Sequence, residues 1–161
     1  MQKDLDEEAL LDSRFLEKSY QEAMALTQAV ASYLEGEHEQ IRNHGLTADT
    51  EVYYASESMR VSTCLMQVMS WFLVQKGVAT GEITKEQAGS SKFRLGAGDI
   101  CLARVDTSKG NLPKQFIIFL HKAQNLYRQV ARMDRMVYGG QDTANPVHEM
   151  FNRIQGQDKP E

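Results

Sequence analysis

Three long stretches of the chain repeat hydrophobic residues every three or four positions, which is the spacing of an amphipathic α-helix. The first stretch runs from about Asp12 or Ser13 to His44 and stops before Gly45, a residue type common just after a helix. Its apolar positions are Leu16, Tyr20, Ala23, Met24, Leu26, Val30, Leu34 and Ile41. This pattern predicts a long first helix with one buried face.

The second stretch is more hydrophobic than a helix with a single buried face. No charged residue occurs from Val61 to Gln75, and hydrophobic positions take up more than half of the helix circumference. Thr47 and Thr50 precede it as candidate caps. A membrane span needs about 20 mostly apolar residues, more than this run offers. We therefore predict a helix at the centre of a bundle or at a subunit interface.

The second helix also carries a narrow polar stripe. Its members are Ser56, Arg60, Thr63, Gln67 and Ser70. One interpretation is that the stripe is the solvent-facing side of the helix. In the other, Arg60 and Gln67 form hydrogen bonds across a dimer interface and fix its register, as buried polar residues can. The dimer interface predicted on this second interpretation comprises Arg60, Gln67, Met66, Met69, Phe72 and Leu73.

The third stretch has the most regular pattern in the chain. Pro113 is placed to open a helix, and Gly139 and Gly140 are placed to end it. Hydrophobic residues alternate steps of four and three, which is a heptad repeat. They are Leu112, Phe116, Phe119, Ala123, Leu126, Val130, Met133 and Val137. Three long amphipathic helices predict an all-α fold, an antiparallel three-helix bundle that forms one domain over residues 1–140.

The segments outside these helices are less regular. Residues 84–87 have the spacing of a capping box and predict a short helical turn. Residues 89–111 are glycine-rich without a sustained period, and we expect a long loop with a possible short strand. Residues 141–161 are predicted to be a flexible tail. Four of its residues would share one face of a short docking helix: Val147, Met150, Phe151 and Ile154.

Charge is distributed unevenly over the 161 residues. The net charge of −4 argues against general affinity for nucleic acid. Residues 1–44 carry a net charge of −6, whereas residues 112–139 carry +4. Arg128, Arg132 and Arg135 lie at i, i+4 and i+7, so they share one side of the third helix. These arginines either belong to an ordinary solvated face or form a docking stripe for an acidic protein partner.

Candidate chemistry is sparse. The two cysteines are far apart without a CxxC motif, and no signal-peptide pattern opens the sequence, so a cytoplasmic protein with free thiols is expected. The four histidines lack the spacing of a metal site, and no nucleophile motif occurs. We predict no catalytic residue, no metal and no cofactor. An enzyme or small-ligand protein that uses residues 89–111, with Cys101 and His121, is the alternative, and a DNA-binding regulator is the weakest hypothesis.

Three segments resemble the alphaproteobacterial RcdA family, the regulators of CtrA degradation, formerly a domain of unknown function. They are "SRFLEKSYQEAMALTQAVASYL", "ESMRVSTCLMQVMSWFLVQKGVATGEIT" and "FIIFLHKAQNLYRQVARMDRM". The resemblance covers about residues 13–138. It implies a dimeric helical bundle that acts as an adaptor: together with a receiver-domain response regulator, it docks on the protease ClpXP and delivers cell-cycle regulators for degradation. It implies no catalytic residue.

Overall fold

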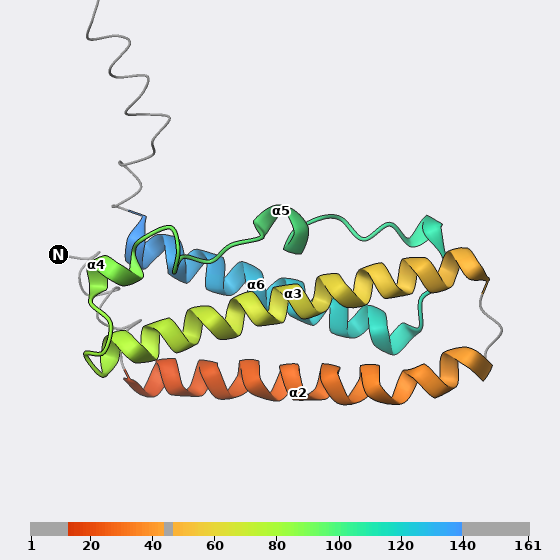
Figure 1. Ribbon diagram of the computed structural model, residues 1–161, viewed down its shortest axis with the longest axis horizontal. Coiled ribbons are helices and arrows are strands. Elements are labelled where there is room, and N and C mark those ends of the chain that lie inside the picture. The colour runs from red at the N-terminus through yellow and green to blue at the C-terminus, as the bar shows by residue number, and fades with distance from the viewer. Residues whose placement is uncertain (1–12, 44–46, 140–161) are drawn as a thin grey trace, which may run out of the picture.

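The computed structural model describes residues 13–43 and 47–139, and this part of the chain is helical without a strand. Three long helices are present: α2 (Ser13–Asn43), α3 (Ala48–Ala79) and α6 (Lys114–Tyr138) (Figure 1). Two one-turn helices, α4 (Lys85–Ala88) and α5 (Gly98–Cys101), and the 3-10 turn η1 (Thr107–Lys109) lie between α3 and α6. The predicted all-α class is confirmed, but the five helices are more than a simple three-helix bundle.

Helices α3 and α4 begin where their capping residues predict. The Thr47 side chain accepts a hydrogen bond from the backbone N–H of Thr50 and caps α3, whose first turn carries Asp49 and Glu51. Acidic residues there favour the positive end of the helix dipole. The predicted capping box forms at α4, where Thr84 and Gln87 exchange hydrogen bonds between side chain and backbone.

The first two long helices are antiparallel, as predicted. The Glu17 carboxylate near the start of α2 forms an ion pair with Lys76 near the end of α3, at 2.9 Å. One turn further along α2, the ring of Tyr20 lies edge-on to the ring of Phe72, which is one turn earlier in α3. Contacts that advance along one helix and retreat along the other define an antiparallel pair.

The prediction that the third long helix is antiparallel to the second is wrong. Tyr54 in α3 packs on Phe116 early in α6, with 4.7 Å between ring centroids. Near the ends of the same helices, the Tyr138 hydroxyl bonds to the side-chain oxygen of Gln75 at 2.7 Å. Both contacts join residues separated by a similar distance in the sequence, so α3 and α6 run parallel, and both run opposite to α2 (Figure 1).

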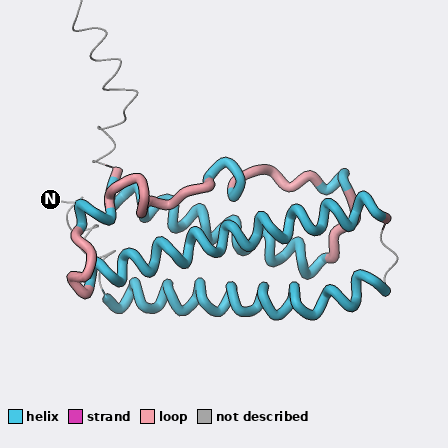
Figure 2. The backbone as a smooth tube through the Cα atoms, in the orientation of Figure 1, coloured by secondary structure: helices cyan, strands magenta, loops and turns pink. Residues whose placement is uncertain are grey.

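A parallel pair requires a connection that returns along the whole length of the molecule. Residues 80–113, which we call the crossover, make this return and carry α4, α5 and η1 (Figure 2). The short strand that the sequence left open for the expected loop does not form in the crossover, since α5 occupies part of that sequence. Ala97 precedes α5 with a left-handed backbone conformation, φ 59°. Cys101 in α5 and Ala88 in α4 are fully buried, so the crossover belongs to the core.

Helix α3 lies at the centre of the molecule and contacts α2, α6 and the crossover. This arrangement explains why its sequence is hydrophobic around most of its circumference. The buried face of α6 is wider than the predicted heptad seam, because α6 also packs against the crossover. Buried residues of α6 outside that seam are Leu120, Gln124, Tyr127, Asp134 and Tyr138.

Candidate docking surfaces

The crossover is attached to the helices by buried polar side chains, and this attachment shapes the surface nearby. Arg60 in α3 is 7% exposed and donates hydrogen bonds to the carboxylate of Glu57 and to the backbone carbonyl of Ala103. Gln124 in α6 donates to the carbonyls of Ala103 and Cys101, at 2.9 and 3.2 Å. The two long helices therefore hold the end of α5 and the residues after it from both sides.

A second attachment lies at Gly96, just before α5. The Gln67 side-chain oxygen accepts its backbone N–H at 3.1 Å, and the Tyr127 hydroxyl donates to its carbonyl at 2.5 Å. Burial raises the pKa of Tyr127 to about 12, so this hydroxyl stays a donor over the physiological range. Gly96 thus has both of its backbone polar groups bonded to side chains of the long helices.

A third attachment centres on Asp134 in α6, which is 5% exposed. One carboxylate oxygen accepts the indole N–H of Trp71 at 2.9 Å, and the other accepts from Arg94 of the crossover at 2.8 Å. The Arg94 guanidinium also lies over the ring of Tyr138. The buried Asp134 carboxylate therefore has a cation beside it and a hydrogen-bond donor for each of its two oxygens.

Neither interpretation of the polar stripe describes Arg60 and Gln67. Arg60 is buried and Gln67 half-buried, and both bond to the crossover of their own chain. Phe72 is buried, packed between Tyr20 and Trp71. Of the predicted dimer-interface residues, Met66 and Leu73 are exposed and Met69 is half-buried.

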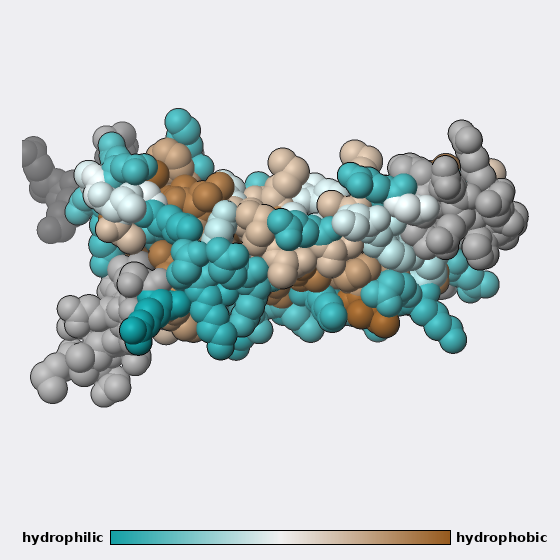
Figure 3. Space-filling model, turned by 90° about the horizontal axis from the view of Figure 1, so that it is seen from below, coloured by the Kyte–Doolittle hydropathy of each residue, from teal (hydrophilic) through white to brown (hydrophobic). Residues whose placement is uncertain are grey.

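The solvent-facing side of α3 is instead hydrophobic. Four large apolar residues follow each other at intervals of seven: Val52, Met59, Met66 and Leu73. Their side chains are 55–73% exposed. We call this set the α3 stripe. Seen from the α2 side, the molecule shows hydrophobic side chains among mostly hydrophilic ones (Figure 3). A heptad repeat of exposed apolar residues is typical of a helix that packs against another helix.

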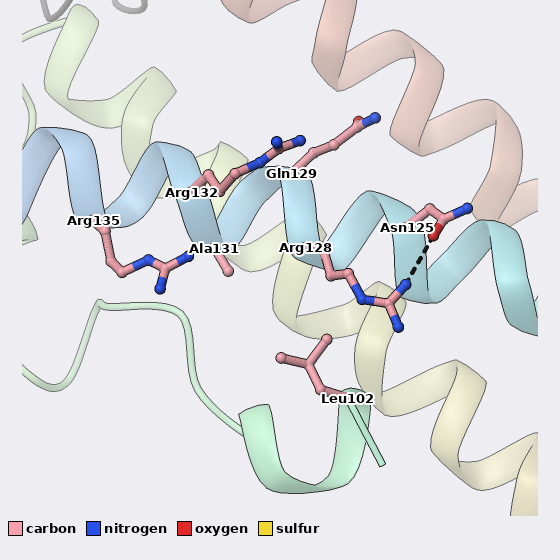
Figure 4. A pocket seen from close by; sticks show the side chains of 7 residues that line it. All are labelled: Leu102, Asn125, Arg128, Gln129, Ala131, Arg132 and Arg135. Atoms are coloured by element: carbon pink, nitrogen blue, oxygen red, sulfur yellow. Dashed lines mark hydrogen bonds between the residues drawn. The ribbon is translucent and has the colours of Figure 1, made fainter. Parts of the chain in front are cut away.

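Arg128, Arg132 and Arg135 line one groove between α6 and the end of α5 (Figure 4). The other residues that line it are Leu102, Asn125, Gln129 and Ala131. We call this site the basic groove. The Arg128 and Arg135 side chains extend toward the side where Leu102 lies, whereas Arg132 extends to the other side of α6 (Figure 4). All three arginines line this groove, and their role as a docking stripe stays a prediction.

The charge of the basic groove is not neutralised by its lining. Arg128 donates to the side-chain oxygen of Asn125 at 2.8 Å, a neutral partner. No acidic side chain lines the groove, and within the described residues none of its arginines forms an ion pair. Asp134, the acid nearest in sequence, is buried and bonded to Trp71 and Arg94. The groove therefore presents uncompensated positive charge beside the exposed Leu102.

The remaining candidate chemistry does not converge on a site. Cys64 and Cys101 are both buried in one cluster of the core, and this burial raises the pKa of each thiol. Cys101 is fully buried whereas His121 is exposed, so the two residues of the enzyme hypothesis do not share an accessible pocket. Over residues 13–43 and 47–139, no group of three metal-binding side chains occurs. None of the described helices has the length and hydrophobicity to cross a bilayer.

The predicted docking helix of the tail lies outside the described residues. This applies to all four of its predicted contact residues, Val147, Met150, Phe151 and Ile154.

Comparison with known families identifies the chain. Residues 7–157 match the model of a family described as "Protein of unknown function (DUF1465)". The chain belongs to this family. A solved structure of RcdA from Caulobacter crescentus CB15 is similar to this DUF1465 protein, with 32% sequence identity and a TM-score of 0.59. The match covers 76% of this chain and 90% of the RcdA chain. The resemblance to the RcdA family is confirmed. No curated protein matches the chain.

Proposed function

We propose that this DUF1465 protein is a non-catalytic adaptor of ATP-dependent proteolysis in the cytoplasm. It delivers cell-cycle regulators to the protease ClpXP together with a receiver-domain response regulator. The observation that carries the proposal is the likeness to RcdA, at 32% identity over most of both chains. The surface supports it, since an adaptor works by docking proteins and two exposed features of this chain suit that purpose.

The basic groove is the proposed docking site for an acidic segment of a protein partner. Guanidinium groups form bidentate hydrogen bonds with carboxylates, and three of them line a single groove without an acid among them. The exposed side chain of Leu102 adds an apolar contact at the edge. A partner segment that mixes acidic and apolar residues fits both parts of the site.

The α3 stripe is the proposed contact between two copies of the chain. Met66 and Leu73 belong to the predicted dimer interface, and the stripe extends it to Val52 and Met59. Arg60 and Gln67 would support this contact indirectly, by fixing the crossover on the neighbouring side of α3. The tail residues from Val147 to Ile154 are proposed as a further docking segment.

Degradation of a client regulator by purified ClpXP and a receiver-domain partner tests the proposal. The assay is run with the DUF1465 protein present, absent, or truncated after Gly140. We expect faster degradation only when the protein is present, and a weaker effect with the truncated form. Failure to accelerate any candidate client, by a protein that is folded by circular dichroism, would contradict the adaptor role.

A further inference from the structure

The basic groove has a possible occupant within the same chain. Residues 1–12, which precede α2 and lie outside the described residues, are strongly acidic. The acids are Asp4, Asp6, Glu7, Glu8 and Asp12, and the single basic residue is Lys3. The segment therefore has a net charge of −4, opposite to that of the groove. We call residues 1–12 the acidic segment.

The acidic segment precedes a part of α2 that lies near Arg132, one of the three arginines of the basic groove. Phe15, in the first turn of α2, is exposed and lines a mostly apolar groove together with Met133 and Met136 of α6, and among the described residues Glu22 is the one acid in its lining. Arg132 lines both this apolar groove and the basic groove. Its side chain extends to the side of α6 away from Leu102 (Figure 4). The chain therefore enters α2 one side chain away from the basic groove.

The acidic segment is long enough to extend along the arginines of the basic groove. Twelve extended residues span up to about 40 Å. The stretch from Arg128 to Arg135 along α6 is only about 10 Å long at the rise of an α-helix. Because a short tether raises the local concentration of a ligand to roughly the millimolar range, even a weak contact is populated.

The composition of the segment also fits the exposed surface. Glu7 and Glu8 are followed closely by Leu10 and Leu11, so the segment offers a pair of carboxylates and a pair of apolar side chains within a few residues. The surface near the start of α2 has the same mixture, with Arg132 beside the exposed Met136. Carboxylates suit the guanidinium groups, and the leucines suit the apolar groove.

We propose that the acidic segment binds the basic groove of its own chain and must be displaced by any acidic partner. Residues 141–161 are the other segment of this chain that could bind the basic groove. This segment has a net charge of only −2 over a longer sequence, from four acids and two basic residues. The proposal concerns a contact within one chain, so it stands or falls independently of the adaptor role.

Paramagnetic relaxation in the full-length protein tests the contact. A nitroxide is attached to an Ala9→Cys variant; Cys64 and Cys101 are almost fully buried and do not compete for the label. We expect loss of amide signal intensity at Arg128, Arg132 and Arg135, reversed by reduction of the nitroxide. The loss should diminish as salt rises, because the contact is electrostatic.

Matched variants make the outcome decisive. Asp4→Asn, Asp6→Asn, Glu7→Gln and Glu8→Gln in the labelled chain should restore the signals while leaving the fold untouched. Truncation after Gly140 should leave the signal loss unchanged. Three outcomes would overturn the proposal: full signal intensity in the labelled parent, a loss that survives neutralisation of the acids, or a loss seen only when labelled chains are mixed with unlabelled isotope-enriched chains, which reports contact between molecules.

Discussion

Arg60 is a charged side chain at the buried centre of the molecule, and its contacts explain how the fold tolerates it. Its guanidinium is bonded to the Glu57 carboxylate and to the carbonyl of Ala103, so the charge is paired and each of its three nitrogens donates a hydrogen bond. The sequence showed only a polar position on an apolar helix. The backbone carbonyl that accepts its hydrogen bond comes from 43 residues away, and no local pattern predicts such a partner.

We predict that Arg60→Met destabilises the protein by about 3 kcal/mol or more, because it leaves the buried Glu57 carboxylate unpaired. Chemical denaturation measures the free energy of unfolding. The matched control is Arg104→Met at an exposed position of the crossover, which should change stability by less than about 0.5 kcal/mol. Equal effects from the two variants would show that the buried pair does not hold the crossover.

The two buried thiols predict how stability depends on alkaline pH. Burial raises the pKa of Cys64 and of Cys101 in the folded chain, so the unfolded chain loses these protons first as pH rises. Their contribution is complete below the unfolded pKa of about 8.5 and is lost above it. The free energy of unfolding should therefore fall from about pH 8.5 upward, by up to about 1.4 kcal/mol per thiol per pH unit. A Cys64→Ala, Cys101→Ala variant should show a flatter profile, and an unchanged slope in that variant would contradict the assignment.

At the scale of elements, the long helices could be predicted and the crossover could not. Each long helix repeats its pattern over many turns, and the predicted start of the first helix at about Asp12 or Ser13 agrees with α2, which begins at Ser13. Helix α5 has a single turn, too short to show a period, and its position depends on bonds from Gln67, Tyr127 and Gln124. The sequence therefore indicated a loop where the structure has an anchored connection.

We predict that Tyr127→Phe loosens the crossover without unfolding the protein. The substitution removes the hydroxyl that bonds to the Gly96 carbonyl, at a cost of about 1 kcal/mol. Amide hydrogen exchange should become faster around α5 and stay unchanged in the centre of α3. Gln115→Ala, at an exposed position of α6, serves as control and should leave exchange unaltered.

The α3 stripe predicts self-association that depends on its apolar side chains. Met59→Glu with Met66→Glu places charges on two adjacent positions of the stripe and should shift the protein to a monomer in sedimentation analysis. Ser70→Glu places a charge at an exposed position of α3 outside the stripe and should leave association intact. A parent protein that is monomeric at high concentration would contradict the proposed contact.

At the scale of the whole molecule, the arrangement of α3 and α6 determines where the basic groove lies. Because α6 runs parallel to α3, the crossover returns along the molecule and brings Leu102 against the arginines of α6. The spacing of Arg128, Arg132 and Arg135 predicted that they share a side of one helix. Their groove could not be predicted, since its second wall depends on the parallel direction, which the sequence pattern does not reveal.

Client degradation by ClpXP with a charge-reversed basic groove tests the central claim most directly. Arg132→Glu with Arg135→Glu removes the positive charge from the groove, and Lys114→Glu with Lys122→Glu makes the same change of net charge on exposed residues of α6 outside the groove. We predict at least about a tenfold loss of stimulated degradation for the arginine variant, the equivalent of about 1.4 kcal/mol in docking, and a near-normal rate for the lysine variant. Equal rates for the two variants, both folded, would contradict docking at the basic groove.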